Sequence, residues 1–180
     1  WVKAAAAMAS AKAIAALPIF ATAKLLLFRA VVMSKILYGA EVAAFTKAQI
    51  DKVQIRTLDT LRPSLRGKRR HRTLALNLLF YDTPVDLRMT WFVHCVRSMR
   101  AHLDHHPHEQ ANILRIWDRY VECPPKSFGP IRPLFLAADG LKLIPEVGGI
   151  FRTHEGFALS PLSDDIHRFT LLAKRQALWA

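Results

Sequence analysis

The stretch SKILYGAEVAAFTKAQIDKVQIRTL, residues 34–58, decides how the helices of this chain follow one another. An apolar helical run ends at Tyr38, Gly39 comes next, and a second run begins beyond Thr46. Glycine readily takes the left-handed conformation that ends a helix, so we expect Gly39 to close the first helix. Thr46 and Gln49 have the spacing of a capping box, which predicts the start of the second helix.

Further helices are expected on both sides of this stretch. Helical propensity and the spacing of apolar residues predict helices at 3–16, 22–38, 46–61, 84–103 and 109–121. Thr83 has the place of an N-cap, Pro84 that of the first helical residue, and Asp86 that of an acid at the positive helix end. The run TLALNLLFYD, residues 73–82, suits a helix or a strand, and helix is favoured because this start signal follows it.

The last third of the chain has a different texture. Residues 123–133, CPPKSFGPIRP, contain four prolines and predict an irregular boundary. Short apolar runs separated by Gly-Gly and Glu-Gly then predict a small β-hairpin or meander. A final helix is expected after Ser163 as its cap, with Asp164 and Asp165 in its first turn. The predicted fold is therefore mainly α, a helical bundle with a small C-terminal β-hairpin and a terminal helix, in two regions: 1–123 and 124–180.

Net charge is the first functional indication. The chain has 26 Lys and Arg against 14 Asp and Glu, a net charge of +12. Residues 1–90 hold 15 of these basic residues and 5 of the acidic ones, whereas residues 91–180 hold 11 and 9. A positive field of this kind attracts polyanions such as nucleic acid or an anionic membrane surface. The alternative is a basic surface that only aids solubility.

Cysteine content and the N-terminal region bear on the compartment. Cys95 and Cys123 are too few for a disulfide framework, which favours a reducing, intracellular compartment. Five cations interrupt the apolar N-terminal region: Lys3, Lys12, Lys24, Arg29 and Lys35. A membrane span needs roughly 20 apolar residues, so we expect no membrane partner; an amphipathic targeting helix is the alternative. Because the sequence starts at Trp1, we expect a piece of a longer reading frame.

The run LRPSLRGKRRHRT, residues 61–73, is the strongest candidate binding segment. Arginine side chains can donate two hydrogen bonds to one phosphate, and binding of this kind weakens with salt without reading base sequence. A solvated loop or a nuclear-import signal is the alternative, and the latter would place the protein in the nucleus. The candidate nucleic-acid-binding residues are Arg62, Arg66, Lys68, Arg69, Arg70 and Arg72.

A histidine-rich segment, residues 94–109, has the residue types of a metal site but not the spacing. His94 and His102 lie eight residues apart, and three more histidines crowd a proline loop: His105, His106 and His108. Tetrahedral zinc sites use closer, regular ligand spacings. We interpret the segment as an exposed helix end and expect neither a metal nor another cofactor.

No catalytic motif is visible. Asp82 and Asp86 could suggest paired carboxylates for metal-assisted phosphoryl transfer, but Asp86 has a capping role and no third acid lies nearby. The sequence has no nucleophile elbow, no P-loop and no dinucleotide-binding glycine motif. The aromatic residues Trp91, Phe92, Trp117, Tyr120 and Trp179 could stack on bases, but they lie at helical spacing among apolar neighbours, so we expect most of them in the core.

The string ILYGAE, residues 36–41, and the helix, spacer, helix and basic run around it resemble the segment that follows the catalytic palm in reverse transcriptases of non-LTR (LINE-type) retrotransposons. The resemblance covers residues 11–103. It implies a thumb-like helical bundle that grips an RNA and/or DNA duplex, with Tyr38, Gly39 and Glu41 at the turn between two helices. It further implies a palm, in the remainder of a parent RNA-directed DNA polymerase, as a partner. The palm's aromatic-x-Asp-Asp string is absent here, so the resemblance implies a non-catalytic fragment.

Two other hypotheses remain open at this point. A helical protein-interaction or scaffold domain with a basic surface would meet its partner through an apolar face. A metal-dependent hydrolase would use the histidine-rich segment.

Overall fold

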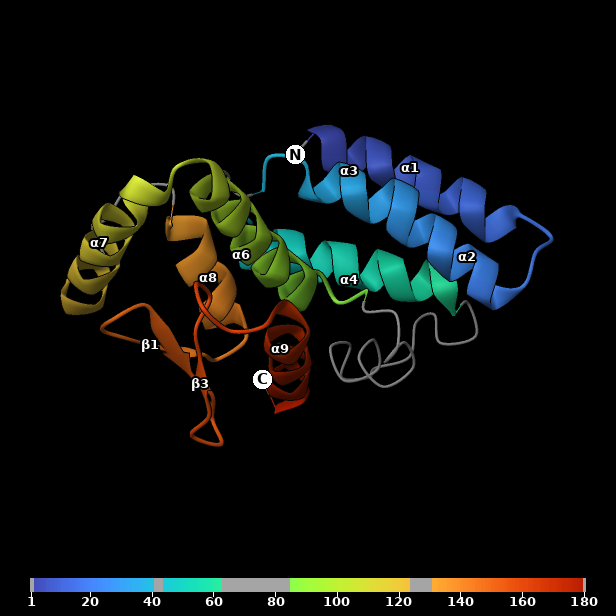
Figure 1. The fold of residues 1–180 in the computed structure, drawn as a ribbon. Coiled ribbons are helices and arrows are strands. Elements are labelled where there is room, and N and C mark those ends of the chain that lie inside the picture. Colours follow the sequence, from blue (N-terminus) through green and yellow to red (C-terminus); the bar gives the residue numbers. More distant parts are fainter. Residues whose placement is uncertain (1, 41–43, 63–84, 124–130, 180) are drawn as a thin grey trace. The chain divides into compact units, whose positions relative to one another are not determined.

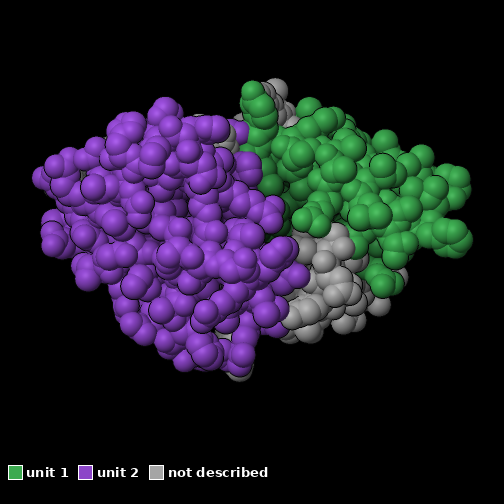
Figure 2. Space-filling model, viewed as in Figure 1, with its two compact units in different colours: residues 1–38, 45–90 green, residues 39–44, 91–180 purple. Residues whose placement is uncertain are grey.

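The computed structural model describes residues 2–40, 44–62, 85–123 and 131–179. It is mainly helical, with a small three-stranded antiparallel sheet and a C-terminal helix, which confirms the predicted fold class (Figure 1). The chain divides into two compact units, unit 1 with residues 1–38 and 45–90 and unit 2 with residues 39–44 and 91–180 (Figure 2). The predicted boundary between 123 and 124 falls beside residues outside the described ranges and stays a prediction.

Unit 1 is a bundle of helices, and its elements agree with the first three predicted helices. The first helix, α1 (Val2–Ala16), packs against both of the others: it contacts η1 and α3 of the second predicted helix, and it contacts α4, which is the third (Figure 1). The second predicted helix is a single rod with a π-helical middle, η1, whose flanking residues keep right-handed helical angles. The elements are α1 (Val2–Ala16), α2 (Ala21–Leu27), η1 (Phe28–Met33), α3 (Ser34–Leu37) and α4 (Lys47–Leu61).

The core of unit 1 combines small side chains from α1 with larger ones from the other helices. On α1, Ala7, Ala11 and Ile14 are buried at spacings of four and three residues, which places them on one face. Alanines on that face let the larger side chains of the facing helices approach closely. These buried side chains are Phe28, Val32, Met33, Ile36, Leu37, Ile50, Val53, Leu58 and Leu61. Helix α2 (Ala21–Leu27) itself contains no buried residue.

Side-chain caps begin α4 (Lys47–Leu61) and α6 (Leu87–His105). The capping box of α4 is confirmed: the Gln49 N–H donates to Thr46 Oγ1 over 3.3 Å, and the Thr46 N–H donates to Gln49 Oε1 over 2.8 Å. Helix α6 (Leu87–His105) begins later than predicted. Its first residue follows Asp86, whose Oδ1 accepts from the Arg88 N–H over 2.9 Å. Asp86 is therefore the cap itself, and Thr83 and Pro84 lie outside the described residues.

The first turn of α6 belongs to unit 1 and the rest of it to unit 2. The other helices of unit 2 are η3 (Pro107–Glu109), α7 (Gln110–Glu122), α8 (Arg132–Gly140) and α9 (Ile166–Trp179). The sheet has the order β1-β2-β3, with β1 (Ile144–Glu146), β2 (Ile150–Arg152) and β3 (Ala158–Leu159). Pro145 pairs with Phe151 and Phe151 with Leu159, so the three strands form a meander.

Aromatic rings from five elements form the core of unit 2. Phe151 of the middle strand lies 5.5 Å from the ring of Phe92, 4.7 Å from that of Trp117 and 5.6 Å from that of Phe135. Phe169 of α9 stacks on Phe92 at 5.4 Å. Trp91, Phe92 and Trp117 are buried, as predicted for most of the aromatic residues, whereas Tyr120 is only half-buried.

Two predictions for the C-terminal region are wrong. Irregular structure was predicted for the whole of residues 123–133, but α8 begins at Arg132 with Pro133 in its first turn, where proline costs no hydrogen bond. Ser163 was expected to cap the last helix. Instead Asp165 Oδ1 accepts from the backbone N–H groups of His167 and Arg168, over 2.9 Å and 3.0 Å.

Candidate functional site

The turn after α3 has the predicted conformation at its glycine. Gly39 has φ 76°, in the left-handed region, and Tyr38 before it is 72% exposed. The next carbonyl is anchored within unit 2, because Ala40 O accepts a hydrogen bond of 2.9 Å from Trp91 Nε1. Glu41 lies outside the described residues. Whether Tyr38 and Gly39 serve a duplex-gripping bundle stays a prediction.

The basic run falls almost wholly outside the described residues. Of its six candidate residues only Arg62 is described, as the exposed C-cap of α4. The other five are Arg66, Lys68, Arg69, Arg70 and Arg72, and their role stays a prediction.

The described surface of unit 1 has charge of one sign. Every charged residue that is exposed in the described part of this unit is a lysine or an arginine. Asp51 and Asp59 are half-buried, and Asp86 is fully buried at 0% exposure. Asp51 also lies 3.7 Å from the Arg88 guanidinium. The exposed cations are Lys12, Arg29, Lys35, Lys47, Lys52, Arg56 and Arg62, which we call the basic set.

Unit 2 differs in this respect, because both acidic and basic residues are exposed on its described surface. Arg152 donates to both carboxylate oxygens of Glu146, and Arg175 pairs with Glu155 at 2.8 Å. The hydrogen bond from Arg152 lowers the pKa of Glu146. Over the whole sequence unit 1 has 15 Lys and Arg against 4 Asp and Glu, whereas unit 2 has 11 against 10. Almost all of the net charge therefore belongs to unit 1.

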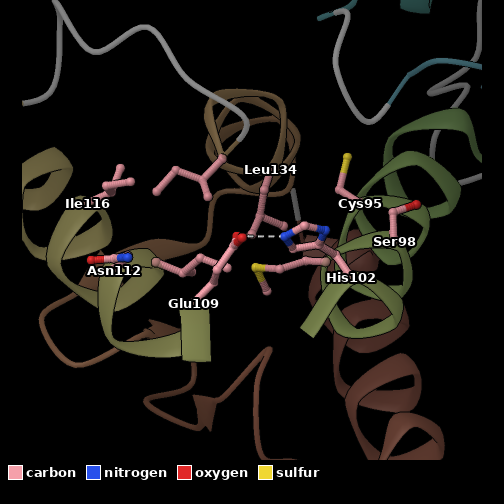
Figure 3. Close-up of a pocket in the computed structure, with 10 residues that line it drawn as sticks. Cys95, Ser98, His102, Glu109, Asn112, Ile116 and Leu134 are labelled. Atoms are coloured by element: carbon pink, nitrogen blue, oxygen red, sulfur yellow. Dashed lines mark hydrogen bonds and ion pairs between the residues drawn. The ribbon is translucent and has the colours of Figure 1, made fainter. Parts of the chain in front are cut away.

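A cavity of about 440 Å³ lies in unit 2 between α6, α7 and α8. Its wall is mostly apolar, and Figure 3 shows Cys95 and Ser98 on one side, Asn112 and Ile116 on another, and Leu134 between them. The lining residues are Cys95, Ser98, Met99, His102, Glu109, Asn112, Ile113, Ile116, Ile131 and Leu134. A space of this size and lining suits an apolar group of a small molecule or of a partner side chain.

Two polar residues of the lining meet each other. His102 Nε2 lies 2.7 Å from Glu109 Oε2, as the dashed line in Figure 3 shows. The hydrogen bond with His102 is the main cause that lowers the pKa of Glu109; partial burial opposes it, and His102, His106 and His108 lower that pKa further by their charge. The ring of His106 lies 4.8 Å from that of His102 and 6.0 Å from that of His108.

The spacing of the histidines in the sequence did not lead us to predict this cluster. His94 and His102 were the pair compared, but His102 and His106 are the pair separated by one helical turn. The sequence signal that could have found them is the i, i+4 spacing, followed by a histidine and a glutamate two and three residues beyond. His105 does not join the cluster of potential ligands that the described residues form.

Comparisons with protein-family models, with curated proteins and with solved structures find no match for this chain. Within the described residues, no helix has both the length and the apolar character that a bilayer crossing requires.

Proposed function

We propose that this chain binds the phosphate backbone of a nucleic-acid duplex through unit 1, without reading base sequence. The observation that carries the proposal is the single sign of the exposed charge on the described part of that unit. Phosphate contacts by lysine and arginine release condensed counterions, and this supplies most of the affinity in non-specific binding. Binding of the phosphate backbone requires no catalytic residue.

The basic set is distributed over several helices, which supports phosphate binding by a surface and not by one loop alone. Lys12 is on α1, Arg29 and Lys35 are on the second rod, and Lys47, Lys52 and Arg56 are on α4. Lys35 Nζ also donates to Ser10 Oγ over 3.2 Å, which places this cation beside α1. Arg62 ends α4 just before the predicted basic run. Charges on three helices that pack together can contact successive phosphates of a duplex.

We further propose that the helical region 1–123 corresponds to the thumb of a non-LTR retrotransposon reverse transcriptase. The support is the string ILYGAE together with a helical rod, a left-handed Gly39 and a capped second helix. Sequencing the DNA upstream of the Trp1 codon tests this part. An in-frame aromatic-x-Asp-Asp palm motif is expected, whereas an initiation codon directly before Trp1 would contradict it.

The salt dependence of duplex binding tests the proposal. The full chain is titrated with a fluorescent RNA–DNA duplex at several salt concentrations, and log Kd is plotted against log salt. Changing Lys52, Arg56 and Arg62 together to Gln should weaken binding and reduce the slope by about 0.9 for each phosphate that the variant no longer neutralises. A second variant, with Arg69, Arg70 and Arg72 changed to Ala, should also weaken binding and reduce this slope.

A matched control removes equal charge from unit 2. Arg97, Arg119 and Arg168 are exposed there, and their change to Gln lowers net charge by the same three units. The control should keep the wild-type slope. Equal weakening in both variants, or weak binding that does not respond to salt, would contradict a basic duplex-binding surface and favour the protein-interaction alternative.

A further inference from the structure

A cluster of potential metal ligands lies where α6 turns into α7. One ligand atom each from His106, His108 and Glu109 can be chosen so that all three lie within 4.8 Å of one another. His102 stands beside them through its contact with Glu109 at 2.7 Å. His106 and His108 are exposed and Glu109 is half-buried, so an ion from solvent can reach all three side chains.

The backbone explains why these side chains converge. The His106 N–H donates to His102 O over 2.9 Å, which continues the helical pattern of α6 by one residue. Pro107 then starts the short 3₁₀ turn η3, and the Glu109 N–H donates to His106 O over 3.0 Å. Residues three apart in such a turn lie nearly above one another. His106 and Glu109 therefore lie on the same side of a hydrogen-bonded turn.

We propose that His106, His108 and Glu109 bind a divalent transition-metal ion, with Zn²⁺ as the best match to this donor set. Imidazole nitrogens with one carboxylate oxygen suit Zn²⁺, and two histidines with a glutamate form a known type of zinc site. Ligand atoms around tetrahedral zinc are roughly 3.3 Å apart, given metal–ligand distances of about 2.0–2.2 Å. The three ligand atoms lie within 4.8 Å of one another, so ligation requires the exposed imidazoles of His106 and His108 to rotate toward the carboxylate.

His102 acts as a positioning residue in this site. It holds the Glu109 carboxylate by a hydrogen bond, and partners of this kind fix the orientation of a metal-binding group. The inference is independent of nucleic-acid binding, because all four residues belong to unit 2 and the basic set belongs to unit 1.

Calorimetric titration of the full chain with ZnCl₂ tests the proposal. The exposed free thiol of Cys123 is first removed by Cys123→Ser, so that it cannot supply a competing ligand. One ion per chain is expected. His106→Ala and His108→Ala should each weaken binding by more than about 100-fold, and His102→Ala should weaken it by about 10- to 100-fold. With Co²⁺ as the probe, visible absorption bands should appear in the parent and should be absent in His106→Ala and His108→Ala.

The matched control is His105→Ala, a neighbouring exposed histidine outside the cluster, and it should bind like the parent. Glu109→Gln keeps the size of the side chain and removes only the anionic donor, so a loss of affinity there reports the ligand and not misfolding. Absence of saturable one-to-one binding would overturn the proposal. Equal weakening by His105→Ala and His106→Ala, or unchanged affinity in Glu109→Gln, would overturn it too.

Discussion

At the scale of single residues, two adjacent glycines in the β1–β2 turn show two different reasons why a position requires glycine. One reason is a left-handed backbone, and the other is lack of space for a side chain. Gly148 and Gly149 have nearly the same φ, 78° and 76°. A Cβ added to Gly148 would meet nothing within 4 Å, whereas one added to Gly149 would lie 2.7 Å from Leu114 Cδ2. The two positions therefore share the cost of a left-handed backbone but differ in packing.

Alanine at each position should measure these two costs. We expect Gly148→Ala to destabilise the protein by about 1–2 kcal/mol through the backbone alone. Gly149→Ala should cost about 1–3 kcal/mol more, because the added methyl group must displace Leu114. Urea unfolding followed by fluorescence of the tryptophans measures both values. Equal destabilisation would mean that Leu114 moves aside freely, and Leu114→Ala in the Gly149→Ala background should recover part of the difference.

At the scale of elements, the start of α9 depends on one carboxylate. Asp165 accepts hydrogen bonds from two backbone N–H groups, and these lower its pKa, with the bond from Arg168 as the largest cause. Partial burial opposes this effect, and the charges of His167 and of Arg100 on α6 add to it. Because the folded pKa lies below the unfolded one, the cap stabilises fully above the unfolded value and is lost as pH falls through the folded one.

An acid titration followed by NMR checks this cap. The amide signals of His167 and Arg168 should shift together, with a midpoint below about 3.9, the ordinary aspartate pKa. Asp165→Asn keeps a hydrogen-bond acceptor but has no proton to gain, so the shift should disappear in that variant. A midpoint at or above the ordinary value would contradict the capping assignment, as would a shift that persists in Asp165→Asn.

At the scale of the whole molecule, the two units differ most in charge. Unit 1 has a large excess of basic residues and only basic exposed charges in its described part, whereas unit 2 is nearly balanced. A field of this kind concentrates polyanions over one part of the chain and not over the other. Binding of a duplex should therefore be confined to unit 1.

Lysine acetylation in the presence and absence of a duplex should show this asymmetry. Lys12, Lys35 and Lys47 of unit 1 are exposed, as is Lys142 of unit 2. Mass spectrometry should find the first three modified more slowly when the duplex is present, while Lys142 reacts at an unchanged rate. Protection of Lys142 to the same extent would place the nucleic acid on unit 2 as well and would contradict the proposal.

Local signals in the sequence predicted most of the elements correctly. The capping box at Thr46, the left-handed Gly39 and the glycine-separated strands depend on neighbours within a few residues, which the sequence displays directly. The start of α8 was missed because a proline-rich run can end with a helix whose first turn contains Pro133. The cap of α9 was displaced by two residues because Ser163 and Asp165 both have suitable side chains.

The amino-acid sequence by itself determined the helical class, the closing glycine and the uneven net charge, because each depends on residue type and short spacing. Only the tertiary structure decided that Trp91 holds Ala40 O and that Phe92, Trp117, Phe135, Phe151 and Phe169 form one core. It also brought His102, His106, His108 and Glu109 together and left only basic charges exposed in the described part of unit 1. These arrangements depend on which faces pack against each other, and packing joins residues that lie far apart in the chain.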